Sequence, residues 1–349
     1  MSPPDAVATY PGPVVSAAGV DADLVDLPAT LARGLDAVEE NLLRSVSHVD
    51  DLVDAVAHHL VLAGGKRVRP TLTLLAAQLG DPTRPEVVTA ATAVELTHLA
   101  SLYHDDVMDS APLRRGAPAA HEVWGNEVAI LTGDLLFARA SRLVAELGPR
   151  AVRLQAETFE RLCLGQLHET VGPRPGEDPV EHHLQVLSDK TGSLIATSAR
   201  YGAELSGADP AVVDLLVAYG EAVGVAFQLA DDVLDLSDPQ ARAERTGKVP
   251  GTDLREGVAT LPTLLARARA AAGDPGAIAL VELLDADLTD DAALARALTA
   301  LGADSATEEA MDEARRWSAR SVEALDPLPA GAVKDALVAF ARSVTDRDR

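Results

Sequence analysis

Two aspartate-rich pentapeptides in this chain could hold metal ions. The first, DDVMD, spans Asp105–Asp109, and the second, DDVLD, spans Asp231–Asp235. Each follows an apolar stretch with helical spacing, so the first and last aspartates of each motif fall about 40° apart on one helix face. Hard cations such as magnesium prefer carboxylate oxygens and keep waters or substrate phosphates in their other positions. Two such clusters facing each other would form a multi-metal site for a diphosphate.

Basic residues gather at two places in a chain that is otherwise strongly acidic. Lys66, Arg67 and Arg69 precede a predicted helix, whose N-terminal amides favour anions. Arg114 and Arg115 follow the first aspartate motif, and guanidinium groups suit bidentate contact with phosphate. The net charge of −24 argues against nucleic acid as a partner, because its phosphate backbone needs a basic surface. A small anionic substrate fits these local clusters.

Several further motifs accompany these residues in a definite order. Together with the aspartate motifs they resemble the trans-type isoprenyl diphosphate synthases, the polyprenyl synthetase family. The resemblance covers about residues 30–345 and is carried by GGKRVRP at 64–70, the segment Glu95–Gly116, KTG at 190–192, FQLADDVLD at 227–235 and GKVPGTDL at 247–254.

The resemblance implies a magnesium-dependent enzyme with up to three Mg²⁺ ions in each active site. Its most rate-sensitive ligands would be Asp105, Asp109 and Asp231. The full set of metal ligands implied by the two motifs is Asp105, Asp106, Asp109, Asp231, Asp232 and Asp235.

Two diphosphate substrates are implied by the same resemblance. Lys66 and Arg69 would hold isopentenyl diphosphate, with His98 and Arg115 completing its pocket. His98 lies seven residues before Asp105, two helical turns away, so both project to the same side. Around the allylic diphosphate and the developing cation, the family places Arg114, Lys190, Thr191, Gln228 and Lys248, of which Lys190, Thr191 and Gln228 are also expected to be catalytic.

Five other positions carry weaker expectations. Arg67 is expected to be solvated, and His104 to support the first motif. Gln166 and Glu169 lie on one helix face and are expected to reach the site. Val258 stands where the family often has a lysine, so the sequence lacks one basic contact near the second motif.

The implied chemistry is a head-to-tail condensation. Metal ions neutralise the allylic diphosphate as it leaves, and the double bond of isopentenyl diphosphate attacks the allylic cation. A proton is then lost, and the released diphosphate is the expected acceptor because no side chain stands out as a strong base. Water would quench the cation, which favours an apolar cavity walled by helices.

The composition favours helices over strands. Hydrophobic residues make up 47% of the chain but aromatic residues only 3%. We therefore predict one all-α domain over residues 29–349, after a disordered tail at 1–28. The family resemblance implies the isoprenoid synthase fold, with its helices around a central cavity. The predicted helices span about 30–63, 71–80, 86–110, 127–147, 150–170, 180–206, 210–236, 259–272, 276–285, 291–301, 306–323 and 330–345.

Location and assembly follow from simple features. Cys163 is the only cysteine, which excludes an intrachain disulfide and fits a reducing cytoplasm. The sequence has no run of 18 apolar residues, so we predict no membrane span, and its start does not resemble a signal peptide. The family resemblance implies a homodimer, and release of the product would need only transient membrane contact.

Product length depends on the helix before the first motif. Thr97, Ala100 and Ser101 lie eight, five and four residues before Asp105, and all three are small. Short-chain family members commonly have an aromatic residue four or five positions before the motif. We therefore predict an open tunnel and a long-chain product for quinone side chains.

Three alternatives remain open from the sequence. A farnesyl or geranylgeranyl diphosphate synthase would share every motif and differ only in product length. A class I terpene cyclase would normally replace the second DDxxD motif and lack the isopentenyl pocket. A non-catalytic subunit of a heteromeric synthase would be expected to have lost aspartate or arginine ligands.

Overall fold

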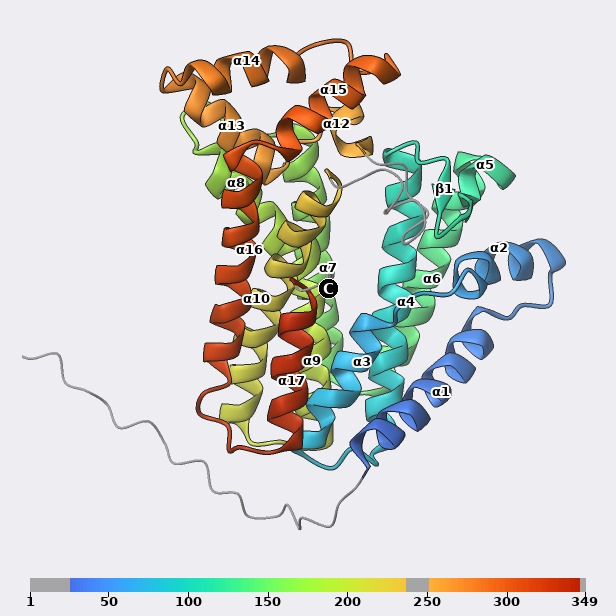
Figure 1. Ribbon diagram of the computed structural model, residues 1–349. Helices are drawn as coiled ribbons and strands as arrows, with labels where there is room; N and C mark the ends of the chain where they lie inside the picture. Colours follow the sequence, from blue (N-terminus) through green and yellow to red (C-terminus); the bar gives the residue numbers. More distant parts are fainter. Residues whose placement is uncertain (1–25, 237–250, 346–349) are drawn as a thin grey trace, which may run out of the picture.

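Long helices carry almost all of the residues that this computed structural model describes, 26–236 and 251–345 (Figure 1). The only strands among these residues form a two-stranded antiparallel hairpin. The N-terminal elements are α1 Leu27–Val46, α2 Asp51–Leu62, α3 Val68–Ala76, η1 Ala77–Leu79, α4 Pro85–Met108, β1 Leu113–Arg114, β2 Ala117–Pro118, α5 Ala120–Trp124, α6 Asn126–Glu146 and α7 Pro149–Val171.

A second set of helices completes the bundle and covers one end of it (Figure 1). They are α8 Pro179–Leu187, the π-helix η2 Ser188–Gly192, α9 Ser193–Ser206, α10 Pro210–Leu234, α12 Thr252–Glu256, α13 Leu261–Ala271, α14 Pro275–Leu284, α15 Asp291–Gly302, α16 Ser305–Ala324 and α17 Ala332–Ser343.

Many helix starts are encoded by an aspartate followed by proline. Asp178, Asp209 and Asp274 each accept a hydrogen bond from a backbone amide of the helix they precede. Proline then occupies the first turn, where its missing N–H costs nothing. Part of the strong negative charge of the chain is therefore used to cap helices.

The core is divided around two central helices, α4 and α10. One apolar cluster packs α4 against α1, α2 and α6, and a second packs α10 against α3, α9, α16 and α17. α9 contacts both α4 and α10. Since each aspartate motif ends one of the two central helices, this packing determines where the two motifs lie.

The structure corrects the predicted helix at 30–63. α1 ends at Val46 and α2 begins at Asp51, because the Asp50 carboxylate accepts hydrogen bonds from two amides of α2 and starts a new helix there. Val49, which fitted the apolar spacing, is 97% exposed in the connection. The sequence also missed the hairpin, α5, α12 and η2. Residues 1–25 lie outside the described residues, and α1 already begins at Leu27, within the predicted tail.

α10 is the one described helix that is long and apolar enough to cross a membrane. It has 25 residues and a mean hydropathy of 1.6 in its most apolar window, of which 61% is buried inside the protein. A core helix of a soluble protein passes the same test. The absence of a membrane span therefore stays a prediction.

Candidate functional site

The first aspartate motif ends α4, and its outer aspartates face charged groups from other elements. Burial raises the pKa of Asp105 to about 6, with a further contribution from Asp109, while Lys190 and Arg114 oppose the rise. Asp109 is exposed at the end of the helix. Carboxylates that raise each other's pKa in this way form a site that favours added cations.

Lys190 lies beside these carboxylates. Its ammonium donates to the Glu169 carboxylate of α7 at 2.5 Å. Burial alone would lower the pKa of Lys190, but Glu169, Asp105 and Asp109 together raise it above the usual value. Lys190 is therefore a charged ammonium at pH 7. The predicted approach of Glu169 to the site also agrees with this geometry.

Asp106 is buried and pairs with the hairpin. Arg114 donates from Nε to Asp106 Oδ1 at 2.6 Å, and its Nη2 lies 2.5 Å from the same oxygen. The other oxygen, Oδ2, is buried with no hydrogen-bond partner in the described part of the chain. The arginine expected at the allylic diphosphate thus also holds the middle aspartate of the motif.

The second motif is packed more tightly into the bundle. Asp232 is 4% exposed, and its Oδ2 lies 2.9 Å from His183 Nε2 of α8. The backbone amide of Leu261 donates to the same oxygen at 3.4 Å. Asp231 is half-buried and Asp235 is buried. Asp232 therefore fastens the end of α10 to α8 and α13, a role that the sequence did not predict.

Magnesium fits the donor set of the two motifs, because all six side chains offer hard carboxylate oxygens. The raised pKa of Asp105 and the unpartnered Asp106 Oδ2 both favour a cation here. Within residues 26–236 and 251–345, however, no three His, Cys, Asp or Glu side chains converge as a ready metal site. The six-ligand assignment therefore stays a prediction, with Asp106 and Asp232 already bonded to protein groups.

A cationic pocket lies further down α4, away from the carboxylates. Burial lowers the pKa of His98 well below its usual value, and the charges of Arg69 and Arg115 lower it further. Burial likewise lowers the pKa of Arg69 to about 10, and its Nε has no hydrogen-bond partner among the described residues. Neutral His98 among these guanidinium groups is an arrangement that would favour a bound anion. The structure thus brings together three of the four residues expected at isopentenyl diphosphate, while Lys66 is exposed.

Arg67 was expected to be solvated, and that expectation was wrong. Arg67 is 8% exposed and bonded to Glu39 of α1 and Glu95 of α4. It adopts a left-handed backbone conformation, with φ of 47°, at the start of α3. Arg67 thereby joins α1, α3 and α4 and holds Arg69 beside His98.

Arg115 is held by carbonyl groups of the glycine turn. Its Nη1 donates to the Leu60 carbonyl at 3.2 Å and to the Gly64 carbonyl. A Cβ at Gly65 would lie 2.8 Å from the Arg115 guanidinium, so a side chain at this position would displace it. The glycine pair therefore admits Arg115 to the pocket as well as turning the chain.

The remaining predicted residues lie in several places. Thr191 Oγ1 donates to Gln228 Oε1 at 3.4 Å, which brings these two together. The His104 ring nitrogen Nε2 lies 3.1 Å from the Ile130 carbonyl and so links α4 to α6. Val258 is half-buried beyond α12. Gln166 Oε1 has no hydrogen-bond partner among the described residues, and Lys248 lies outside those residues.

The three expected length-determining residues do not share one environment. Thr97 is buried and accepts from Gln155 Nε2 of α7 at 2.8 Å, a partner that the sequence missed. Ser101 is half-buried and donates to the His98 carbonyl at 2.8 Å. Ala100 is fully buried in the cluster with α1, α2 and α6. Thr97 and Ser101 are therefore hydrogen-bonded, whereas Ala100 packs against apolar side chains.

Comparisons with known proteins identify the family of this chain. Residues 50–301 match the model of the polyprenyl synthetase family. A nonaprenyl diphosphate synthase of Mycobacterium tuberculosis is 43% identical over 318 residues, which cover 91% of this chain and 93% of that protein.

Solved structures show the same architecture. A geranylgeranyl pyrophosphate synthase from Corynebacterium glutamicum, complexed with calcium and isoprenyl diphosphate, is 42% identical with a TM-score of 0.80, covering 92% of this chain and 97% of its own. A decaprenyl diphosphate synthase from Rhodobacter capsulatus is 32% identical with a TM-score of 0.81, covering 93% and 99% respectively. The predicted all-α isoprenoid synthase fold is confirmed.

Proposed function

We propose that this chain, which belongs to the polyprenyl synthetase family, is a prenyltransferase that joins isopentenyl diphosphate head-to-tail to an allylic diphosphate and repeats the step to a long all-trans product. One observation carries the proposal. Two sites of opposite charge lie along α4: the Arg69–His98–Arg115 pocket, to which α4 contributes His98, and, two turns further on, the carboxylates of Asp105 and Asp109. Each suits a different substrate: a free diphosphate in the pocket and a metal-bound diphosphate at the carboxylates.

Each side chain has a definite task in this reaction. Arg69 and Arg115 bind isopentenyl diphosphate, and neutral His98 can donate a hydrogen bond to it without adding a charge. Lys190 binds the allylic diphosphate and stabilises the negative charge that grows on it as it leaves. Thr191 and Gln228 lie next to Lys190 and orient the reacting end of the allylic chain.

We propose Mg²⁺ as the bound cation, which would neutralise the leaving diphosphate as a Lewis acid. Asp105, Asp109 and Asp231 are the residues proposed to hold it. The hard oxygen donors and the calcium in the Corynebacterium glutamicum synthase support a divalent cation. Magnesium titration after treatment with a chelator tests this proposal: activity should be absent without a divalent cation and return with Mg²⁺.

We propose a product of roughly thirty to fifty carbons, because each buried methylene gains about 0.8 kcal/mol and no bulky side chain stands at Thr97, Ala100 or Ser101. Purified protein should be incubated with Mg²⁺, isopentenyl diphosphate and farnesyl diphosphate, and the products measured by mass spectrometry. A ladder ending above twenty carbons supports the proposal. Products that stop at fifteen or twenty carbons would favour a short-chain synthase, and no product at all would contradict the prenyltransferase assignment.

A homodimer is supported by apolar side chains exposed on α6 and α7. Phe137 of α6 packs against Phe159 of α7 with ring centroids 4.3 Å apart, so the two helices offer one continuous surface. Leu131 is 65% exposed on α6 and Leu167 is 57% exposed on α7. Burial of such a surface against a second copy would remove an apolar patch from water.

Light scattering tests this assembly. The wild-type chain of 36.4 kDa should give twice that mass, and a variant with Leu131→Glu and Leu167→Glu should give the monomer. Ile278→Glu is the matched control, because Ile278 is 43% exposed on the distant α14. A monomeric wild type with full activity would overturn the proposal.

A cytoplasmic location is proposed from the cysteine content. Cys163 is the single cysteine and carries a free thiol, so the fold needs no oxidising compartment. Fractionation of cells that express the full chain should recover it with cytoplasmic markers, and recovery in a secreted or periplasmic fraction would contradict this.

A further inference from the structure

A π-helical turn interrupts the helix at the point where two of the substrate-facing residues lie. η2 covers five residues between α8 and α9, and both Lys190 and Thr191 belong to it. π-turns are rare, are less stable than α-helix and are often found at functional sites. Some feature of the surrounding structure must therefore hold this one in place.

Two glycines on the neighbouring helices allow η2 to pack closely. A Cβ on Gly165 of α7 would lie 2.6 Å from the backbone nitrogen of Lys190. A Cβ on Gly224 of α10 would lie 2.5 Å from the Gly192 Cα. Because real Cβ contacts are never this short, only glycine fits at either place. η2 is thus enclosed between α7 and α10, backbone against backbone.

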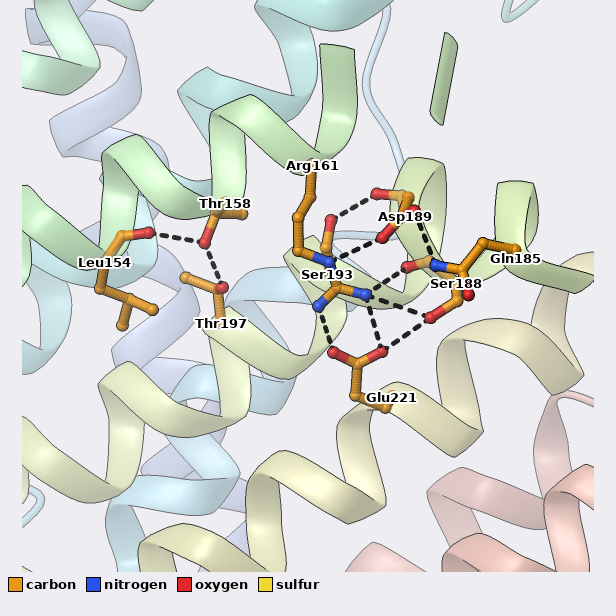
Figure 2. Close-up of polar contacts among 9 residues, drawn as sticks. All are labelled: Leu154, Thr158, Arg161, Gln185, Ser188, Asp189, Ser193, Thr197 and Glu221. Atoms are coloured by element: carbon orange, nitrogen blue, oxygen red, sulfur yellow. Dashed lines mark hydrogen bonds and ion pairs between the residues drawn. The ribbon is translucent and has the colours of Figure 1, made fainter. Parts of the chain in front are cut away.

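A cluster of polar residues at one end of η2 fixes its position (Figure 2). Arg161 of α7 donates from Nε to Asp189 of η2 at 2.8 Å and from Nη2 to Ser188 Oγ at 3.1 Å. Both of its terminal nitrogens also bond to the Glu221 carboxylate of α10. We call Arg161, Ser188, Asp189 and Glu221 the Arg161 cluster. Its members come from all three elements, so one guanidinium joins them.

The opposite charges in the Arg161 cluster strengthen the contacts of Arg161 with Asp189 and Glu221. Burial lowers the pKa of Arg161, but the bonds to Glu221 and Asp189 more than offset this and raise it overall. The two-pronged contact with Glu221 has the bidentate geometry that arginine forms and lysine does not. Asp189 is only 8% exposed, so loss of Arg161 would leave a buried carboxylate without its cation.

Helical spacing links the Arg161 cluster to the substrate-facing residues. On α7, Arg161, Gly165 and Glu169 follow one another at intervals of four, and Glu169 bonds to Lys190. On α10, Gln228 lies seven residues after Glu221, and it bonds to Thr191. Each helix therefore contacts η2 through the Arg161 cluster at one end, a glycine in the middle and a substrate-facing residue at the other.

From this arrangement we infer that Arg161 is a positioning residue: with Asp189 and Glu221, it fixes the π-turn that presents Lys190 and Thr191 to the allylic diphosphate. The inference rests on the proposed function of those two residues. Arg161 itself contacts neither substrate in this role. Its loss should therefore affect the allylic substrate and leave the Arg69–His98–Arg115 pocket on α3, α4 and the hairpin intact.

Two variants and one control test this by steady-state kinetics. Arg161→Gln should lower kcat/KM for the allylic diphosphate about 100-fold, since a misplacement of about 1 Å can cost that much, with KM for isopentenyl diphosphate within about twofold of wild type. Arg161→Lys keeps the charge but loses the bidentate contact and should lie in between. Arg150→Gln is the control, because Arg150 lies on α7 like Arg161 and pairs with Glu204 of α9, but is 76% exposed. A rise in KM for isopentenyl diphosphate as large as the loss of kcat/KM for the allylic diphosphate would overturn the inference.

A double-mutant cycle of Arg161 and Lys190 distinguishes a positioning role of Arg161 from a general effect of its loss on the fold. If Arg161 acts through η2, adding Arg161→Gln to Lys190→Ala should cost clearly less than it costs in the wild type. Full additivity of the two changes would contradict the inference.

Hydrogen exchange, measured without substrate, tests the positioning role of Arg161 independently of the proposed function. Backbone amides of residues 188–192 should exchange hydrogen at least about tenfold faster in Arg161→Gln than in wild type, and at the wild-type rate in Arg150→Gln. Unchanged exchange in Arg161→Gln would overturn the positioning role, whatever the enzyme does. Absence of product from the wild type in the kinetic assay would instead contradict the proposed reaction and leave the exchange result standing.

Discussion

Asp106 and Asp232 occupy the same place in their motifs, directly after the first aspartate, and both are buried. Each is bonded to a basic side chain from another element, Asp106 to Arg114 of the hairpin and Asp232 to His183 of α8. The last aspartates differ, because Asp109 is exposed whereas its counterpart Asp235 is only 3% exposed. The first motif is therefore open to solvent and to Lys190, while the second is packed under α8 and α13.

The aspartate pentapeptide therefore has two tasks. The middle aspartates secure the ends of α4 and α10, and Asp105, Asp109 and Asp231 are the residues proposed to bind the cation. The repeated sequence pattern therefore buries its middle aspartate in two different surroundings. Changes at the exposed Asp109 should mainly affect chemistry, and changes at the buried Asp106 and Asp232 should also affect packing.

The largest expected effect is loss of an outer aspartate. Asp105→Ala, Asp109→Ala and Asp231→Ala should each lower kcat by about 10³-fold or more, because a lost metal contact acts on the charge of the transition state. Asp214→Ala, an exposed aspartate on α10, is the control and should leave kcat unchanged. Near-normal turnover of Asp105→Ala at saturating substrate and Mg²⁺ would remove it from the metal site.

The next largest effect is expected from loss of a side chain that pairs with a middle aspartate. Arg114→Met should lower the free energy of unfolding by about 3 kcal/mol, because it leaves buried Asp106 without its cation. His183→Gln should cost no more than about 1 kcal/mol, because glutamine can still donate and the Leu261 amide keeps its bond to Asp232.

Urea unfolding at pH 7 without metal measures both losses. Arg150→Met, which breaks an exposed ion pair, is the control and should cost at most about 1 kcal/mol. Equal losses in Arg114→Met and His183→Gln would show that the two middle aspartates depend on their partners to the same degree.

The sequence predicted features that depend on residues close together in the chain and missed features that depend on residues far apart in it. Apolar spacing located the long helices, the aspartate motifs were found from local patterns, and Lys190 was found only through the family resemblance. Arg67 was missed as a buried residue because its partners Glu39 and Glu95 each lie 28 positions away. The η2 turn gave no signal in the helical period, since its cause is the close approach of α7 and α10. Pairings between distant elements set both features.

The two motifs also differ in the residue four positions before the first aspartate, which is Ser101 on α4 and Phe227 on α10. Ser101→Phe should therefore shorten the product, because it places on α4 an aromatic side chain like that of Phe227 on α10. Ala100→Phe should also shorten the product and spare the metal site. However, it should cost about 1–3 kcal/mol in stability, because Ala100 is fully buried against neighbouring helices.

Mass spectrometry of the products and thermal unfolding of the two variants measure these effects. Rates of the first condensation step should stay close to wild type in Ser101→Phe, which shows that the metal site is intact. If neither variant changes the length distribution, the growing chain does not follow this part of α4.

The smallest expected effect is a pH dependence that belongs to the surroundings of the first motif alone. The pKa of His98 lies well below its usual value because of burial and the nearby charges of Arg69 and Arg115. The folded protein therefore keeps His98 neutral, while the unfolded chain takes up a proton below about pH 6.5. At His98 the unfolded state then binds more protons, so this residue should lower stability as pH decreases, by at most about 1.4 kcal/mol per pH unit. The raised pKa of Asp105 acts in the opposite direction.

Urea unfolding of the metal-free protein between pH 7 and pH 5 measures this slope. The stability of His98→Asn should fall less with decreasing pH than that of wild type, whereas His48→Asn, at an exposed position on the α1–α2 connection, should keep the wild-type slope. Inorganic diphosphate should reduce the wild-type slope, because an anion in the Arg69–His98–Arg115 pocket offsets the arginine charges and allows His98 to take up a proton in the folded state. A wild-type slope that neither His98→Asn nor diphosphate alters would show that the cationic pocket does not extend to His98.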